Sequence, residues 1–187
     1  VIREEGGSLH TVNRIVRFAE TMRKEADRLK LEEAPVSELI LGTECGGSDP
    51  TSGLAANPVV GCCSDLVVRE GGTVILSETP EMIGAERILA ARCENEGVRR
   101  KLLDTIKNFE MDFLRVGENP RSGNPTPGNI AGGITTLEEK SLGCIHKAGC
   151  SMIREVVGYG EIFTQKGLVV MDTPGQDVAS IVGMAAA

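Results

Sequence analysis

The stretch LGTECGGSDPTSGLAANPVVGCCSD, residues 41–65, joins an apolar run to a polar, glycine-rich loop and then to a second apolar segment. Together with the residues before it, SELILGT at 37–43 predicts a short buried strand, because a brief apolar run bounded by breaking residues is typical of one. A helix is expected to begin near residues 51–55. A strand, a glycine-rich loop and a helix in this order indicate one βα unit of a parallel sheet.

Two further strands are predicted along the chain, GGTVILSET at 71–79 and KGLVVMDTPG at 166–175. A long helical stretch is expected from Pro80 to about Phe113, with a break at Gly97. The segment TTLEEKSLGCIHKAG at 135–149 predicts a short capped helix. Helical segments between strands favour an α/β fold with a mainly parallel, open sheet flanked by helices. Because the carboxyl ends of parallel strands meet at one edge, the loops after the three strands should line one shared crevice.

Two segments fall outside this alternation. Residues 8–31 place apolar side chains at spacings of three and four, which predicts a leading amphipathic helix capped by Ser8. Residues 117–134 hold three prolines and five glycines, which predicts a long loop. We expect a single α/β domain, with residues 1–36 as a leading helical segment and 37–187 as its core, that is a fragment of a longer, multi-domain chain.

Charge and cysteine content restrict the class of protein. Twenty Lys and Arg against 27 Asp and Glu give a net charge of −7, so a nucleic-acid partner is not expected. No apolar run approaches the roughly 20 residues of a membrane-spanning helix, and we expect no membrane contact and a cytoplasmic location. The six cysteines show no CxxC spacing. Adjacent Cys62 and Cys63 are expected to be reduced and packed in the interior.

The loop after the first predicted strand, CGGSD at 45–49, carries groups suited to chemistry. Its two glycines let the backbone approach a ligand and point N–H groups at an anion, while Cys45 and Asp49 can both bind a metal. The alternative is a tight turn in which Ser48 or Asp49 only caps the following helix. Glu78 ends the second predicted strand at the same crevice, and its alternative is a solvated carboxylate at the start of a helix.

The chain contains four further blocks in order, CGGSDPTSGLAANPVVG (45–61), LSETPEMIGAE (76–86), GNPTPGNIAGGITTLEEKSLGCIHKAG (123–149) and GLVVMDTPG (167–175). These blocks resemble the signature of the altronate dehydratase and galactarate dehydratase family. The resemblance spans about residues 40–175 and is highly specific for the family, but not for the sugar acid. The same family includes large subunits of sulfolactate sulfo-lyases, which eliminate sulfite in place of water.

The resemblance implies a hydro-lyase that converts an aldonic or aldaric acid to a 2-keto-3-deoxy acid, with Fe²⁺, or Mn²⁺ or Mg²⁺, as cofactor. A base takes the proton next to the substrate carboxylate, a cation neutralises the developing enediolate, and an acid protonates the departing hydroxyl. On this basis we assign metal binding to Cys45, Glu78 and Cys144, catalysis to Glu78, Asp49 and Lys140, and substrate binding to Gly46, Gly47, Ser48, Asn57, Asn124 and Asn129. Glu81 and Glu86 are second choices for the metal and carboxylate-binding core, as are Lys140 and Cys144.

Other classes of protein stay open beside this one. Besides sulfo-lyase-type elimination, a non-catalytic sugar-acid-binding module would need only the crevice, and an iron–sulfur protein would use the six cysteines. The expected partners are a small sugar acid and the remaining N- and C-terminal domains of the full-length enzyme, and a homo-oligomer is compatible with the sequence. Because another domain is expected to supply part of the site, we expect this chain alone to fold but to be inactive.

Overall fold

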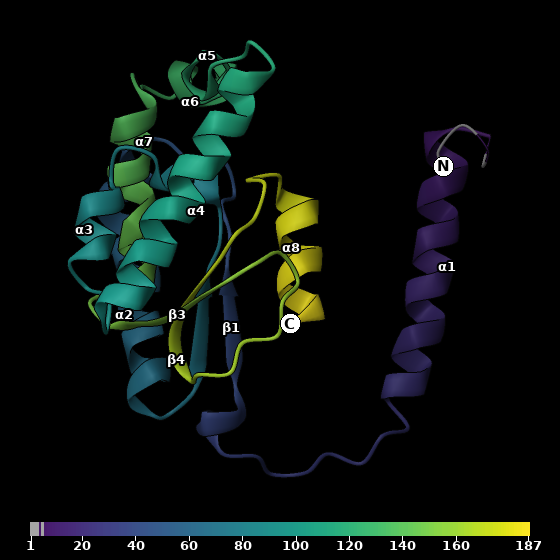
Figure 1. Cartoon of the computed structure of the whole chain (residues 1–187). Helices are drawn as coiled ribbons and strands as arrows, with labels where there is room; N and C mark the ends of the chain where they lie inside the picture. Colours follow the sequence, from purple (N-terminus) through teal and green to yellow (C-terminus); the bar gives the residue numbers. More distant parts are fainter. Residues whose placement is uncertain (1–3, 5) are drawn as a thin grey trace. The chain divides into compact units, whose positions relative to one another are not determined.

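The computed structural model describes residue 4 and residues 6–187. The chain divides into two compact units, residues 1–34 and residues 35–187, and each is described by itself. Figure 1 follows the chain from its first helix, through the sheet, to its last helix.

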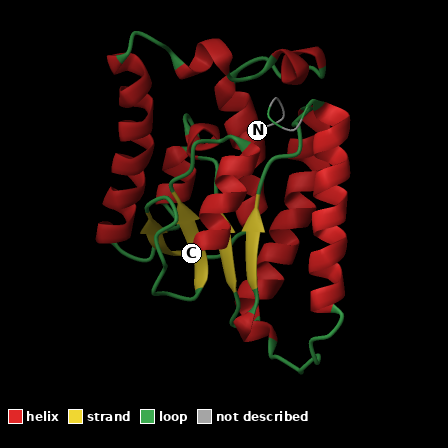
Figure 2. Ribbon diagram, turned by 90° about the vertical axis from the view of Figure 1, so that its right-hand side faces the viewer, coloured by secondary structure: helices red, strands yellow, loops and turns green. Residues whose placement is uncertain are grey.

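Residues 35–187 form an α/β unit around a four-stranded sheet (Figure 2). The strands are β1 (Ile40–Thr43), β2 (Thr73–Leu76), β3 (Ile153–Val157) and β4 (Gly167–Met171). They pair in parallel throughout and lie in the order β1-β2-β4-β3. The mainly parallel α/β sheet and the positions of the three predicted strands are therefore confirmed. The first of them is not the buried strand expected: β1 lies at the edge of the sheet, and Thr43 is its one buried residue. β3 is a strand that the sequence patterns above do not predict.

Helices occupy the connections from β1 to β2 and from β2 to β3, and they also precede β1 and follow β4, while residues 158–166 between β3 and β4 contain none. Their bounds are η1 Val36–Glu38, the π-helical turn η2 Ser52–Ala56, α2 Asn57–Arg69, η3 Thr79–Met82, α3 Glu86–Ala90, α4 Glu96–Arg115, α5 Pro120–Gly123, α6 Pro127–Ala131, α7 Leu137–Cys144, η4 Ile145–Ala148 and α8 Asp177–Ala186. The predicted short capped helix is α7, whose N-cap Thr136 accepts a hydrogen bond from the Glu139 N–H. The proline- and glycine-rich segment 117–134 carries the two short helices α5 and α6.

The two central strands, β2 and β4, are buried along their whole length. Ile75 pairs with Val169, and the next pair is Leu76 with Val170. Because side chains alternate across a sheet, these pairs face opposite cores. Leu76 and Val170 belong to the larger core, which α2, α3, α4 and α7 cover, while Ile75 and Val169 belong to a smaller core that includes Met184 of α8. Figure 1 shows α8 on the opposite side of the sheet from α2, α3 and α4.

The helical stretch expected from Pro80 to about Phe113 is divided into η3, α3 and α4. α3 ends at Ala90 and α4 begins at Glu96, so the helical stretch breaks just before Gly97, where a break was expected. Asn95 caps the new helix, and its side chain accepts a hydrogen bond from the Val98 N–H at 3.0 Å. One local prediction for this unit is wrong. Cys62 and Cys63 are exposed, so they do not pack in the interior as expected.

The first unit, residues 1–34, contains the helix α1, Ser8–Ala26. The predicted leading helix is confirmed, although it ends before residue 31. Gly7 is the N-cap and no side chain caps the helix, so the predicted cap at Ser8 is wrong. None of the side chains of α1 is buried. No helix among the described residues is long and apolar enough to cross a bilayer.

Candidate functional site

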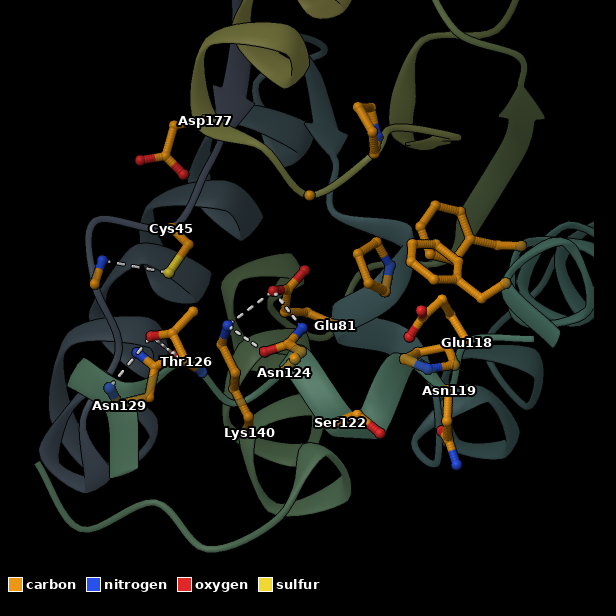
Figure 3. Close-up of a pocket in the computed structure, with 18 residues that line it drawn as sticks. Cys45, Glu81, Glu118, Asn119, Ser122, Asn124, Thr126, Asn129, Lys140 and Asp177 are labelled. Carbon is orange, nitrogen blue, oxygen red and sulfur yellow. Dashed lines mark hydrogen bonds and ion pairs between the residues drawn. The ribbon is translucent and has the colours of Figure 1, made fainter. Parts of the chain in front are cut away.

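A cavity of about 730 Å³ lies at the carboxyl edge of the sheet (Figure 3). Cys45 and Gly47 reach it from the loop after β1, Glu81 reaches it from η3 after β2, and Gly175 and Asp177 reach it from the segment after β4. The loops after three strands therefore line one cavity, which confirms the predicted shared crevice. The remaining wall comes from α4, α7 and the segment between them.

Three side chains from different elements form a closed hydrogen-bonded network in the wall of this cavity. Lys140 of α7 donates from Nζ to Glu81 Oε1 at 2.8 Å and to Asn124 Oδ1 at 2.8 Å. Asn124 completes the network by donating from Nδ2 to the same Glu81 oxygen at 3.0 Å. The side chains of Lys140 and Glu81 are only 5% and 4% exposed, so water screens the pair weakly. The network fixes a cation, a carboxylate and an amide at one place in the wall (Figure 3).

In the glycine-rich loop after β1, the Cys45 sulfur contacts two residues of the same loop. The Gly47 N–H donates to Cys45 Sγ at 3.4 Å, and Sγ lies 3.1 Å from the Ser48 hydroxyl oxygen. Gly47 has φ +100°, a conformation that favours glycine. From α6, Asn129 Nδ2 donates to the Ser48 carbonyl at 2.8 Å and so ties this loop to the opposite wall. Cys45, Gly47 and Asn129 line the cavity, while Gly46 is exposed and is absent from the lining.

Asp49, Ser48 and Asn57 line a second, smaller cavity of about 300 Å³. Asp49 Oδ1 accepts hydrogen bonds from the hydroxyl and N–H groups of Thr51 and Ser52, which hold its pKa below the usual value. Asn57 donates to the Gly143 carbonyl at 3.0 Å. Lys140, which the sequence analysis assigns to catalysis, lines both the larger and the smaller cavity.

Glu78 and Cys144 lie together in the interior and line neither of these cavities. Glu78 has φ 70°, and its N–H donates to Thr173 Oγ1 at 2.6 Å. Its Oε2 contacts Lys147 Nζ and lies 3.5 Å from Cys144 Sγ. Burial raises the pKa of Glu78 to about 7, against the opposing charge of Lys147 and with a further rise from the carboxylates of Glu81 and Glu44.

The three residues assigned to a metal do not fit one in this arrangement. Cys45 lies at the cavity, apart from the buried pair formed by Glu78 and Cys144. The Lys147 ammonium already contacts the Glu78 carboxylate, and burial raises the pKa of Cys144, which favours the neutral thiol over the thiolate that binds metals. Among the described residues, no three His, Cys, Asp or Glu side chains gather as ligands.

Several residues that line the larger cavity were second choices in the sequence analysis or were not named there. Glu81, a second choice above, is the buried carboxylate of the cavity wall. Thr126 and Asp177 also line the cavity, and both lie at or beside helix starts. Gly175 lies in the turn Thr-Pro-Gly after β4. A glycine in such a turn is the sequence feature that could have indicated a backbone segment close to the site.

Sequence comparisons relate this chain to a family of dehydratases and to a sulfo-lyase subunit. Residues 36–187 match the family described as D-galactarate/Altronate dehydratase, C-terminal. Altronate dehydratase of Bacillus subtilis is 48% identical over 158 residues, which is 84% of this chain and 32% of that protein. Galactarate dehydratase (L-threo-forming) of Escherichia coli is 42% identical over 166 residues, 89% of this chain and 32% of that protein. The (2R)-sulfolactate sulfo-lyase subunit beta of Chromohalobacter salexigens is 39% identical over 173 residues, 91% of this chain and 44% of that subunit. The chain thus spans about a third of the length of the dehydratases it matches.

Proposed function

This chain belongs to the D-galactarate/altronate dehydratase family of sugar-acid hydro-lyases, and we propose that its larger cavity is where an aldonic or aldaric acid loses water to give a 2-keto-3-deoxy acid. The observation that carries the proposal is the network of Glu81, Lys140 and Asn124 in the wall of a cavity formed by three strand-end loops. The network offers a fixed cation and polar groups to a substrate that is anionic and rich in hydroxyls. The volume of about 730 Å³ lies in the range of small-molecule sites.

The chain's own residues suggest a division of roles. The Lys140 ammonium is placed to attract the substrate carboxylate and to stabilise the negative charge that develops when the neighbouring proton leaves. Asn124 and Asn129 line the same cavity and offer amide groups to substrate hydroxyls. Asp49 accepts a hydrogen bond from the Ser52 N–H, and we assign it to holding the loop after β1 in place. Glu78 contacts the Lys147 ammonium, and we assign it to holding that group in place.

Elimination of sulfite from a sulfonated hydroxy acid is the second candidate. It is favoured by the 39% identity to the sulfo-lyase subunit, which covers 91% of this chain. Both reactions need a base near a carbon that carries a carboxylate, and they differ in the leaving group. The cavity wall described above serves either reaction, so a substrate panel decides between them.

The test is made on the full-length protein. Altronate, galactarate and sulfolactate are supplied in turn, under reducing anaerobic conditions, with Fe²⁺, Mn²⁺ or Mg²⁺ and without added metal, and 2-keto acid and sulfite are measured. We expect a 2-keto acid from one of the two sugar acids and no sulfite. Sulfite release from sulfolactate alone would select the second candidate, and binding of a sugar acid without turnover would favour a non-catalytic module.

We also propose that residues 1–187 alone give no turnover in the same assay. The chain covers about a third of the length of the matched dehydratases, and electrostatic catalysis needs a site closed to water on all sides. We therefore propose that further domains or a second subunit complete the site. Turnover by residues 1–187 at the full-length rate would contradict this proposal.

A further inference from the structure

We propose that Glu81 is the base of the reaction, and that its Oε2 oxygen takes the proton from the substrate carbon next to the carboxylate. This inference rests on the proposed elimination reaction and adds to it the identity of the proton acceptor. Three observations carry it: the anchoring of one Glu81 oxygen, the lack of a partner for the other, and the glycine that lies close to it.

The Glu81 carboxylate is anchored through Oε1 alone. That oxygen accepts from Lys140 Nζ at 2.8 Å and from Asn124 Nδ2 at 3.0 Å, from two elements distant in sequence. Oε2 is buried, and no hydrogen bond to it comes from any residue that the structure describes. An unpaired carboxylate oxygen in the interior is costly, and native proteins rarely keep one without a use for it. The arrangement holds the carboxylate in position while it reserves one oxygen.

Gly175 lies close to the reserved oxygen, at a position with no room for a side chain. A Cβ atom at Gly175 would stand 3.0 Å from Glu81 Oε2 and 2.4 Å from Pro80 Cγ, and the residue has φ +65°, which disfavours any side chain. Gly175 belongs to the same cavity wall as Glu81. The absence of a side chain at Gly175 therefore leaves Oε2 next to backbone alone on this side, within the wall of the cavity that would hold the substrate.

Other carboxylates near the site are less suited to the role. Glu118 and Asp177 line the cavity but are exposed, so water solvates them. Asp49 lines the smaller cavity, and its Oδ1 accepts three hydrogen bonds. Glu78 contacts Lys147 and lines neither cavity. Glu81 is the lining carboxylate that is both buried and anchored.

The proposed step balances without a co-reactant. The C2–H bond breaks, its proton goes to Glu81 Oε2, and its electron pair forms the C2–C3 double bond as the bond from C3 to the hydroxyl oxygen breaks. The departing hydroxyl takes the proton back from Glu81 and leaves as water, which restores the carboxylate. The enol that remains loses its C2 hydroxyl proton and gains a proton at C3, which gives the 2-keto-3-deoxy acid. Lys140 stays protonated throughout and stabilises the charge on the substrate carboxylate.

The test compares Glu81→Gln with the wild-type full-length protein, with C2-deuterated galactarate and altronate as probes. Gln keeps the oxygen that Lys140 and Asn124 bind but cannot take a proton. We expect kcat to fall about 10²- to 10⁴-fold, as for loss of a general base. Deuterium release to water should fall equally, while calorimetric substrate binding stays within about threefold. Glu81→Asp, a shortened carboxylate, should retain more deuterium release than Glu81→Gln. Glu70→Gln, at an exposed glutamate that lines neither cavity, is the control.

Each other outcome overturns the inference in a recognisable way. If the wild-type protein eliminates water and Glu81→Gln releases deuterium at the wild-type rate, Glu81 is not the base, although the proposed function stands. If substrate binding weakens more than about tenfold while kcat is unchanged, Glu81 binds substrate and does not transfer the proton. If Glu81→Gln fails to fold and Glu81→Asp folds with a wild-type rate of deuterium release, the role is structural. If the wild-type protein acts on neither sugar acid, the proposed function fails first.

Discussion

At the scale of single residues, the buried carboxyl of Glu78 gives the free energy of unfolding a pH dependence. Burial raises its pKa from 4.5 to about 7, so between these values the folded protein keeps a proton that the unfolded chain has lost. Stability from this group is complete below about pH 4.5 and is lost as pH rises through about 7. The loss is on the order of 3 kcal/mol, because one pKa unit corresponds to about 1.4 kcal/mol. Denaturant unfolding of residues 1–187 from about pH 4 to about pH 8 measures it.

A non-titrating variant isolates this contribution. Glu78→Gln keeps the size of the side chain, so the wild-type free energy of unfolding minus that of the variant should fall between about pH 5 and pH 7 and level off above. Glu20→Gln, at an exposed position of α1, is the control and should give a flat difference. Parallel pH curves for the wild type and Glu78→Gln would show that Glu78 does not titrate in this range.

The same residue shows where sequence reasoning reaches its limit. A carboxylate two residues after a buried strand is correctly predicted to lie at the carboxyl edge of the sheet. Its direction depends on the hydrogen bond from its N–H to Thr173 and on Lys147, partners distant in sequence. Those contacts draw Glu78 into the interior and leave Glu81 in the cavity wall. Such long-range partners leave no local sequence pattern. Which of Glu78 and Glu81 lies in the cavity wall could therefore not be predicted from the sequence.

At the scale of elements, α2 packs against η4 with no space for a side chain at Gly61. A Cβ at this position would lie 2.1 Å from the His146 carbonyl oxygen and 3.0 Å from Gly149 Cα. These are backbone atoms, so Gly61→Ala forces the two elements apart. We expect a loss of about 1–3 kcal/mol in the free energy of unfolding from overpacking, reduced by about 1 kcal/mol because Ala favours a helix over Gly. Denaturant unfolding of the variant tests this expectation.

A second glycine supplies the matched control. Gly128 lies in α6, where a Cβ would have its nearest neighbour, Thr126 Oγ1, at 3.9 Å. Gly128→Ala should therefore leave the free energy of unfolding unchanged or raise it by about 0.5–1 kcal/mol. Equal effects of Ala at Gly61 and Gly128 would mean that the close approach of α2 and η4 does not limit stability.

Strand prediction succeeded for the three apolar runs, β1, β2 and β4, and failed for β3, one of the two edge strands. β2 and β4 are central, and their uninterrupted apolar runs are the pattern of a strand buried on both faces. β3 lies at the edge of the sheet, and Arg154 and Glu155 interrupt its apolar run. An edge strand tolerates such charges because one side is not paired. Because of these two charges, the segment lacks the continuous apolar run by which the other strands were predicted. Without β3, the order of the strands in the sheet could not be derived.

At the scale of the whole chain, the family match and the structural unit share a boundary. The match covers residues 36–187, and the second compact unit covers residues 35–187. Residue patterns were sufficient for the parallel sheet and for the shared cavity at its carboxyl edge. The type of reaction came from the resemblance of the four sequence blocks, because the same sheet edge supports many chemistries.

Removal of residues 1–34 should leave the folding of residues 35–187 unchanged. The buried residues of both core clusters lie between Val67 and Met171, and no side chain of α1 is buried. The truncated chain keeps all of this buried apolar surface, so its free energy of unfolding should stay within about 0.5 kcal/mol of that of residues 1–187, as for surface changes. Leu102→Ala, which removes a fully buried side chain of α4, is the positive control and should cost about 2–5 kcal/mol. A truncation loss approaching that of Leu102→Ala would mean that residues 1–34 contribute to the stability of the fold, and that the domain begins before residue 35.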